Sequence, residues 1–321
     1  MFSVISYDPF GLGMHRFASP MTGLTLEYIV YNPVGENLDN VRRNFIVVQC
    51  PGWGIGSSYL QHGLSDLWAP APTESSNTPS TTYTVVFLHP RGTGSSGPVT
   101  WSHTLSTMPD MCADLEDLRV HLRVEQFPVL MGHSNGGAIA LGYAELYPDR
   151  VRKLILVQHQ IIGMGDRQNE KIEAMREDPR YGRALDNLVG RYADTDEGLT
   201  ESVNALWPLY FHDPTKYIDE FLYAVGDQKF PVFTYRYQAH CDESLNSPTQ
   251  MINGLKYVRA KTLVIFGEDD MIIGMKIARR TKEDIPDAKL IAYKECGHFP
   301  WVEQKEEFMK DVRLFIEGSQ N

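Results

Sequence analysis

The stretch Gly-His-Ser-Asn-Gly-Gly at residues 132–137 constrains the fold more than any other feature of this sequence. It follows an apolar run at residues 128–131 and precedes a helical stretch of small residues. A serine between glycines at such a strand-to-helix turn adopts a strained backbone conformation, and its hydroxyl points out of the sheet. The pattern therefore predicts that Ser134 is a nucleophile at the carboxyl end of a buried strand.

Short apolar runs recur along the chain. Between several of them, apolar residues recur every three or four positions, as in an amphipathic helix. Nearly continuous apolar runs are typical of parallel strands that helices cover on both faces. Strands that alternate with helices predict an α/β fold with a mostly parallel, doubly wound sheet. The runs lie at residues 45–48, 84–88, 129–131, 154–157, 263–266 and 290–293, and residues 14–18 and 24–31 before them predict a β-hairpin.

Two segments interrupt this alternation. Residues 161–255 lack the strand pattern, are rich in aromatic side chains and are too long for a plain loop. They predict a mainly helical cap inserted between two strands, with the core formed by residues 1–160 and 256–321. Residues 73–82 are polar and of low complexity, which predicts a flexible loop without chemistry.

A serine hydroxyl needs a base, and the base needs an acid that orients it. In a sheet of this kind the order along the chain is serine, acid, histidine, each after a later strand. The run at residues 263–266 leads into Gly-Glu-Asp-Asp, which offers Glu268, Asp269 and Asp270 as acids. The run at residues 290–293 is followed by His298, whose alternative role is that of a structural loop histidine.

The chain resembles the α/β-hydrolase superfamily over nearly its whole length, and within it the proline-iminopeptidase-like (S33) branch. Gly-Glu-Asp-Asp at residues 267–270 and Gly-His-Phe-Pro-Trp-Val-Glu at residues 297–303 resemble that family's acid and histidine loops. The fourth residue of the family's acid pattern is the catalytic one, so the resemblance implies Asp270. Residues 91–96 resemble the family's R-G-x-G-x-S loop, which implies a structural role. An aspartate is usual two places before the arginine, and here that place is His89.

An oxyanion hole needs two backbone N–H groups that point at the developing negative charge. The N–H of Asn135, next to the nucleophile, is the first candidate. The second is expected in the loop Gln-Cys-Pro-Gly-Trp-Gly at residues 49–54, where relatives commonly carry His-Gly. We favour Trp53 and keep Gly52 as the alternative.

The peptidase activity of the resembling branch does not fit every motif. Proline iminopeptidases usually carry G-G-S-W-G at the serine and H-G-G-P-G in the early loop, whereas this chain has G-H-S-N-G and C-P-G-W-G. No cap residue matches the carboxylates that hold a substrate amine. The aromatic cap favours a bulky apolar substrate, although aromatic residues also form cores. Candidate pocket residues are Trp53, His133, Trp207, Tyr210, Phe211 and Phe299.

We therefore predict a serine hydrolase that cleaves an ester, lactone, thioester or amide bond through an acyl-enzyme. One alternative is non-hydrolytic chemistry on the same triad, such as C–C cleavage, cyclisation or condensation in a biosynthetic pathway. The others are a proline iminopeptidase and a non-catalytic ligand receptor on the same scaffold.

The composition limits the classes of partner and cofactor that the protein can be expected to bind. With 30 Lys and Arg against 41 Asp and Glu, the net charge is −11, which disfavours nucleic acid and anionic membranes. The four cysteines lack zinc-ligand spacing, so no metal or cofactor is expected beside a small-molecule substrate. Without a visible signal peptide or a membrane-spanning run, a cytoplasmic location is expected. Whether the protein is a monomer or a homodimer does not follow from the sequence.

Overall fold

The computed structural model describes residues 8–34, 38–69, 81–165, 172, 175–187, 193–245 and 247–318. Nearly all of the polar segment predicted at residues 73–82 lies outside these ranges. Within them, no helix combines the length and the apolar character that crossing a bilayer requires.

The described residues contain one sheet of eight strands in the order β1-β2-β4-β3-β5-β6-β7-β8. The β1–β2 hairpin is antiparallel and pairs antiparallel with β4, whereas all pairs from β4 to β8 are parallel. This confirms the predicted α/β fold with a mostly parallel sheet. The strands are β1 (Gly13–Ala18), β2 (Thr25–Tyr31), β3 (Phe45–Gln49), β4 (Thr84–His89), β5 (Phe127–His133), β6 (Val151–Val157), β7 (Lys261–Gly267) and β8 (Ala288–Tyr293).

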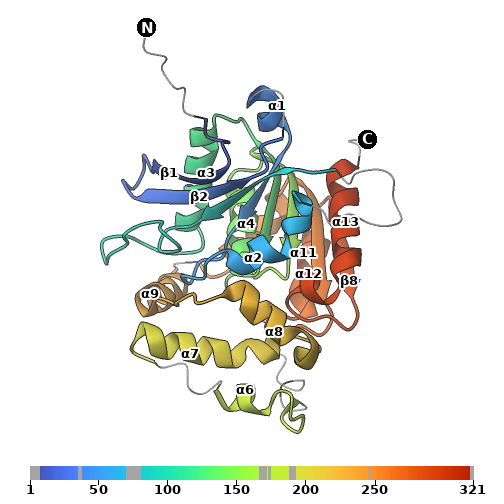
Figure 1. Cartoon of the computed structure of the whole chain (residues 1–321). Helices are drawn as coiled ribbons and strands as arrows, with labels where there is room; N and C mark the ends of the chain where they lie inside the picture. Colours follow the sequence, from blue (N-terminus) through green and yellow to red (C-terminus); the bar gives the residue numbers. More distant parts are fainter. Residues whose placement is uncertain are drawn as a thin grey trace.

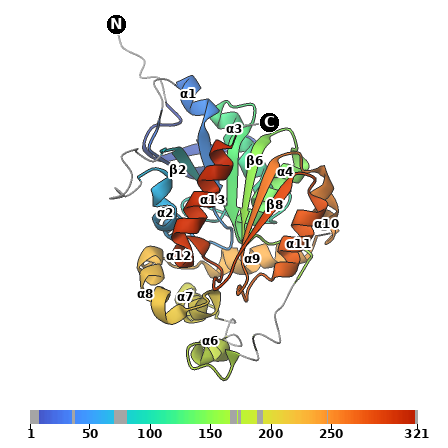
Figure 2. The same cartoon turned by 90° about the vertical axis from the view of Figure 1, so that its right-hand side faces the viewer.

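Helices cover both faces of the sheet (Figures 1 and 2). Along β3, Phe45 and Val47 pack into one apolar core while Ile46 and Val48 pack into the other, as the two-residue period of a strand requires. The first core is completed by α1 (Leu38–Arg43), α3 (Asp110–Leu122), α4 (Asn135–Leu146) and α11 (Met275–Asp284), and the second by α2 (Ser58–Gly63), the 3₁₀ helix η1 (Ser65–Leu67), α12 (Pro300–Glu303) and α13 (Lys305–Glu317).

The segment between β6 and β7, which we call the insertion, is helical where it is described. Figures 1 and 2 place α6 to α9 together beyond one end of the sheet. In contrast, α10 returns to the core, where Met251 is buried and lies against Gly142 of α4. The elements are α6 (Gly182–Asn187), α7 (Asp196–Leu206), η2 (Trp207–Tyr210), α8 (Pro214–Val225), α9 (Val232–Glu243), α10 (Gln250–Gly254) and η3 (Leu255–Tyr257).

Candidate active site

Ser134 lies at the sharp turn between β5 and α4. Its backbone has φ 54° and ψ −123°, a conformation that side-chain-bearing residues rarely adopt. A Cβ at Gly132 would overlap the carbonyl group of Gly136, so the helix can start this close to the strand only because glycine occupies that position. The Ser134 N–H donates to the carbonyl of Val157 (3.0 Å), and its own carbonyl accepts from the N–H of Gln160 (3.2 Å). The serine is thereby fixed at the carboxyl end of β5.

His298 and Asp270 form a buried pair. Nδ1 of His298 lies 2.7 Å from Oδ2 of Asp270. The other carboxylate oxygen of Asp270 accepts the N–H groups of Ile272 (2.7 Å) and Ile273 (3.0 Å). Asp269, an alternative acid, lies instead 2.9 Å from Nδ1 of His212. The geometry therefore singles out Asp270 as the carboxylate that orients the His298 ring.

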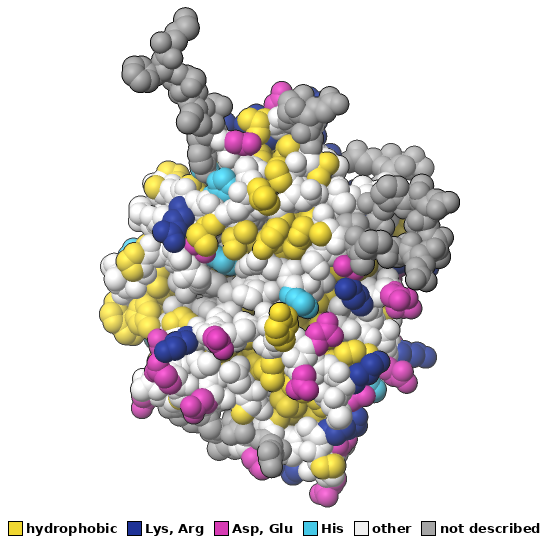
Figure 3. Space-filling view, in the orientation of Figure 1, with side chains coloured by type: hydrophobic (Ala, Val, Ile, Leu, Met, Phe, Trp, Pro, Cys, Tyr) yellow, Lys and Arg dark blue, Asp and Glu magenta, His cyan; other side chains and the backbone are white. Residues whose placement is uncertain are grey.

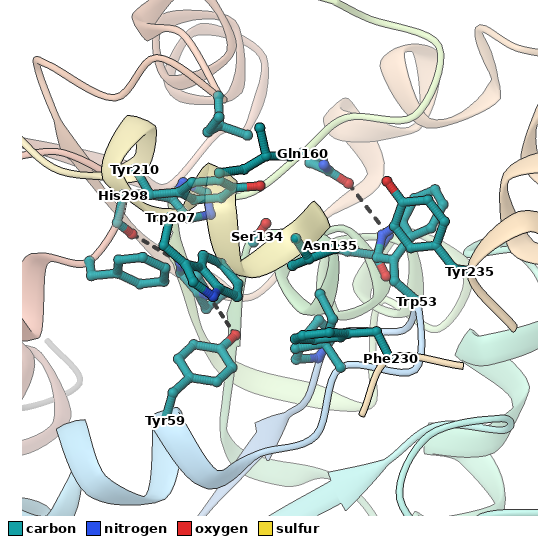
Figure 4. Close-up of a pocket in the computed structure, with 17 residues that line it drawn as sticks. Trp53, Tyr59, Ser134, Asn135, Gln160, Trp207, Tyr210, Phe230, Tyr235 and His298 are labelled. Carbon is teal, nitrogen blue, oxygen red and sulfur yellow. Dashed lines mark hydrogen bonds between the residues drawn. The ribbon is translucent and has the colours of Figure 1, made fainter. Parts of the chain in front are cut away.

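Ser134 and His298 line the same cavity (Figure 4). Within the described residues, however, no hydrogen bond joins the Ser134 hydroxyl to the His298 ring. Catalytic hydrogen bonds often tighten only when substrate binds. The structure thus brings the predicted nucleophile and base to one cavity and pairs the base with its acid, but leaves the serine–imidazole hydrogen bond unformed.

The insertion holds the loop that carries His298. The His298 N–H donates to the carbonyl of Tyr210 (2.7 Å), which belongs to η2. The Glu303 carboxylate accepts the N–H of Gly297 (2.5 Å) from this loop and the N–H of His212 (2.9 Å) from the insertion. Burial raises the pKa of Glu303 to about 7, although these donors oppose the shift. The position of the loop that carries His298 therefore depends directly on the insertion.

His133 connects Tyr59 to the His298 backbone. Its Nε2 donates to the carbonyl of His298 (3.0 Å), so its Nδ1 accepts from the hydroxyl of Tyr59 (3.1 Å). Burial lowers the pKa of His133 well below its ordinary value, which keeps the ring neutral. His133 thus lines the cavity, as predicted for a pocket candidate, and also supports the loop beneath His298.

Both candidates for the second oxyanion donor already donate to amide side chains. The Gly52 N–H donates to Oδ1 of Asn135 (2.9 Å), and the Trp53 N–H donates to Oε1 of Gln238 in α9. The N–H of Asn135, at the first position of α4, is one of the donors that a helix leaves without an intrahelical partner. Sequence reasoning did not find Gln238, because no motif marks a glutamine 185 residues from the group it contacts.

The loop that follows β3 is anchored by His89, which the R-G-x-G-x-S motif indicated, and by Ser57 and Glu27, which no motif indicated. Ser57 Oγ lies 2.6 Å from Nε2 of His89, and Nδ1 of His89 lies 2.9 Å from Oε1 of Glu27. The hydrogen bond from His89 lowers the pKa of Glu27 to about 2. His89 therefore ties the loop to β2. The guanidinium of Arg91 is buried against Asp114 (2.8 Å), in keeping with the structural role expected for the R-G-x-G-x-S loop.

The cavity has a volume of about 250 Å³. Of the six pocket candidates, Trp53, His133, Trp207, Tyr210 and Phe299 line it. Phe211 does not, because it is fully buried and packs on Phe221 and Phe299 instead. The remaining lining residues are Pro51, Ile55, Tyr59, Ser134, Asn135, Gln160, Val203, Leu206, Phe230, Tyr235, Ile272 and His298.

Aromatic and aliphatic side chains form most of the lining, and it contains no Lys, Arg, Asp or Glu among the described residues. Nor do any three His, Cys, Asp or Glu side chains in the described ranges gather in a way that could hold a metal ion. The functional groups available at the cavity are therefore the Ser134 hydroxyl, the two imidazoles of His133 and His298, side-chain amides, tyrosine hydroxyls and backbone N–H groups.

Comparisons with known proteins agree with this architecture. The family model described as alpha/beta hydrolase fold matches residues 46–304. A 2-hydroxy-6-oxo-6-phenylhexa-2,4-dienoate hydrolase of Comamonas testosteroni is 28% identical over 181 residues, which are 56% of this chain and 59% of that protein. The match thus spans about three fifths of that relative. It does not support the proline-iminopeptidase-like branch, which stays a prediction.

Two solved structures show the same fold. The esterase RhEst1 from Rhodococcus sp. ECU1013 superimposes with a TM-score of 0.68 at 16% identity, covering 96% of this chain and 99% of that one. The 2-hydroxy-6-oxo-6-phenylhexa-2,4-dienoate hydrolase from Rhodococcus sp. strain RHA1 gives a TM-score of 0.67 at 18% identity, with coverage of 96% and 99%. At these identities the likeness concerns the fold alone.

Proposed function

The chain belongs to the α/β-hydrolase fold family, and from that premise we propose that it is a serine hydrolase acting on an uncharged, apolar small molecule. The bond it cleaves is an ester or a related acyl bond of a lactone, thioester or amide. The observation that carries the proposal is the buried 2.7 Å pair between Nδ1 of His298 and Oδ2 of Asp270, at the wall of the cavity that also exposes Ser134.

The chemistry follows from the tautomer that Asp270 selects. A carboxylate at Nδ1 keeps the proton on that nitrogen and leaves Nε2 of His298 as the base. After rotation of its side chain toward Nε2, Ser134 attacks the acyl carbon while His298 takes the hydroxyl proton. His298 then gives this proton to the leaving group, and the acyl-enzyme remains. Water, deprotonated by the same nitrogen, attacks the acyl carbon. His298 then gives the proton to Oγ of Ser134 as the acyl–serine bond breaks, and the acid and free Ser134 are released.

The cavity lining supports an uncharged, apolar substrate. A volume of about 250 Å³ is small for a ligand pocket, so the buried part of the substrate is compact. A charged group would lose its hydration there without meeting an opposite charge, which costs free energy. The aromatic walls around Ser134, among them Trp207 and Phe230, instead favour apolar acyl or alkoxy groups.

Cleavage of a C–C bond is the second candidate, because the Comamonas relative is named as a dienoate hydrolase. A dienoate carries a carboxylate, and the described lining offers no Lys or Arg to receive it. A peptidase that binds a free amine meets the converse difficulty, since the described lining contains no Asp or Glu. The uncharged cavity therefore favours a neutral ester over both alternatives.

The test compares substrates and variants. We expect the wild-type protein to hydrolyse p-nitrophenyl butyrate and to react with a fluorophosphonate probe, and Ser134→Ala and His298→Ala to abolish turnover. Ser102→Ala, which removes an exposed hydroxyl, is the matched control for labelling. Probe labelling that survives in Ser134→Ala would show that the nucleophile is misassigned.

A second measurement separates the two chemistries. Faster turnover of 2-hydroxy-6-oxo-6-phenylhexa-2,4-dienoate than of p-nitrophenyl butyrate would replace the ester by the C–C substrate. Turnover of any substrate that persists in Ser134→Ala but disappears in His298→Ala would favour a reaction without an acyl-enzyme, in which His298 acts as general base alone.

A further inference from the structure

The side-chain amide of Gln238 lies behind the oxyanion loop, by which we mean residues 50–57. Gln238 is fully buried in α9, and its Oε1 accepts the N–H of Trp53. Its Nε2 donates to Oδ1 of Asn135 (3.1 Å) and to Oγ1 of Thr107 (3.2 Å). The amide is thus held from three sides, and one of its partners is the favoured candidate for the second oxyanion donor.

The oxyanion loop is shaped to receive this side chain. A Cβ at Gly52 would overlap the Gln238 amide, and a Cβ at Gly54 would overlap the ring of Pro231, which precedes α9. Trp53 itself has φ 60°, in the left-handed region that residues other than glycine rarely adopt. The insertion and the oxyanion loop therefore approach each other closely. The hydrogen bond from the Trp53 N–H to Gln238 helps to hold the Trp53 backbone in this conformation.

The partners of Gln238 do not depend on it equally. Oδ1 of Asn135 also accepts the N–H of Gly52 (2.9 Å), and the hydroxyl of Thr107 also donates to Oδ2 of Asp242 (2.8 Å). For the Trp53 N–H, in contrast, the Gln238 oxygen is the only acceptor among the described residues. Removal of the Gln238 amide would therefore free one donor, the N–H that we favour as the second oxyanion donor.

We propose that Gln238 is a positioning residue that occupies the Trp53 N–H in the substrate-free enzyme, so that the oxyanion hole is completed only when a substrate oxygen replaces the Gln238 oxygen. The inference rests on the proposed hydrolase function. It makes α9 of the insertion a part of the catalytic arrangement, although Gln238 does not itself line the cavity.

The competition between the two oxygens has a definite direction. An amide oxygen accepts hydrogen bonds well, so a neutral ester carbonyl displaces it only at a cost. The oxyanion of the tetrahedral intermediate forms a charge-assisted hydrogen bond that is about twice as strong. Without the Gln238 oxygen, bound ester and transition state both reach the N–H without displacing anything. An equal gain in both states lowers KM and leaves kcat unchanged.

The test is Gln238→Met, which keeps the volume and removes the amide. With p-nitrophenyl butyrate we expect KM to fall about fivefold, the factor that one net hydrogen bond corresponds to, and kcat to stay within about twofold. Gln228→Met is the matched control, because Gln228 also contacts the oxyanion loop but donates to the carbonyl of Gly54 and occupies no N–H. We expect its KM to be that of the wild type.

If Gln238 were merely structural, its replacement would loosen the oxyanion loop and lower kcat without lowering KM. An unchanged or higher KM in Gln238→Met therefore overturns the inference. Gln238→Asn, whose shorter side chain cannot reach the Trp53 N–H, is a second variant with the same expected result if the methionine variant folds poorly. If wild-type protein hydrolyses the ester and Ser134→Ala does not, such an outcome removes only the role of Gln238. If wild-type protein is inactive and unlabelled, the proposed function fails first.

The wild-type protein offers a readout that needs no substitution at Gln238. With selective ¹⁵N-tryptophan labelling, and Trp53→Phe to assign the signal, we expect the Trp53 amide resonance to shift when a fluorophosphonate reacts with Ser134. The phosphonyl oxygen then takes the position of the Gln238 oxygen. A Trp53 amide resonance that does not move on formation of this adduct contradicts the inference.

Discussion

Nδ1 of His298 lies 2.7 Å from Oδ2 of Asp270, and both side chains are buried. The carboxylate is held in turn by two backbone N–H groups, from Ile272 and Ile273. This chain of contacts fixes both the orientation and the tautomer of the imidazole before any substrate arrives. Its functional importance can be measured because a second aspartate stands next to the first.

Asp270→Asn is expected to lower kcat by about 10³- to 10⁴-fold, because an amide at this position stabilises the wrong tautomer and no longer stabilises the imidazolium. Asp269→Asn is the control, since Asp269 contacts His212 rather than His298. The measurement is steady-state hydrolysis of p-nitrophenyl butyrate by folded variants. A larger loss in Asp269→Asn than in Asp270→Asn would reverse the assignment of the acid.

Trp207 is expected to limit the length of the acyl group. Its ring lines the cavity and packs against Tyr210 (5.1 Å between ring centroids) and Phe221 (5.0 Å). Trp207→Phe keeps an aromatic contact but widens the cavity, so the ratio of kcat/KM for octanoate over butyrate esters is expected to rise about tenfold. Phe211→Leu, at a buried position outside the cavity lining, should leave this ratio unchanged, and an equal change in both variants would contradict the assignment of the wall.

The sheet could be predicted from the sequence because its signal is local. Each parallel strand is a short apolar run. The glycines around Ser134 indicate a sharp turn, and residues 132–137 alone are enough to predict it. The loops after two later strands likewise offered His298 as the base and Glu268, Asp269 or Asp270 as the acid, and only the family resemblance selected Asp270. Apart from that choice of acid, these predictions needed only the order of elements and the chemistry of a serine nucleophile.

Contacts between the insertion and the core could not be predicted in this way. Gln238 belongs to no motif, and the motif that ends at Glu303 does not indicate that its carboxylate contacts His212, 91 residues away in the sequence. Phe211 shows the opposite failure. Its aromatic character suggested a pocket residue, but the sequence does not indicate the direction in which the ring points, and it packs into the core. Such residues are found only when the tertiary contacts are known.

One side chain in the core of α4 should make stability depend on pH. Glu145 is buried, and neither of its carboxylate oxygens has a hydrogen-bond partner among the described residues. Gly254 of α10 lies so close that a Cβ there would overlap the carboxylate. Burial raises the pKa of Glu145 from 4.5 to about 9, so the folded protein retains a proton that the unfolded chain releases.

The sign of the effect follows from proton linkage. Where the folded state binds more protons than the unfolded state, the free energy of unfolding falls as pH rises. For Glu145 this contribution is fully present below pH 4.5 and is lost progressively up to about pH 9. Glu145→Gln cannot ionise, so we expect its melting temperature at pH 8 to exceed that of the wild type by about 3 °C, or about 1 kcal/mol. At pH 4.5 the difference should shrink or change sign.

Thermal unfolding at several pH values checks this prediction, with the exposed Glu201→Gln as the control for the loss of a charge. Glu145 lies outside the cavity, so ester hydrolysis by the variant should equal that of the wild type at 25 °C. A melting temperature of Glu145→Gln that follows the wild type in parallel from pH 4.5 to pH 9 would mean that the pKa of Glu145 is the same in the folded protein as in the unfolded chain. In that case water or a rearranged side chain reaches Glu145 within α4.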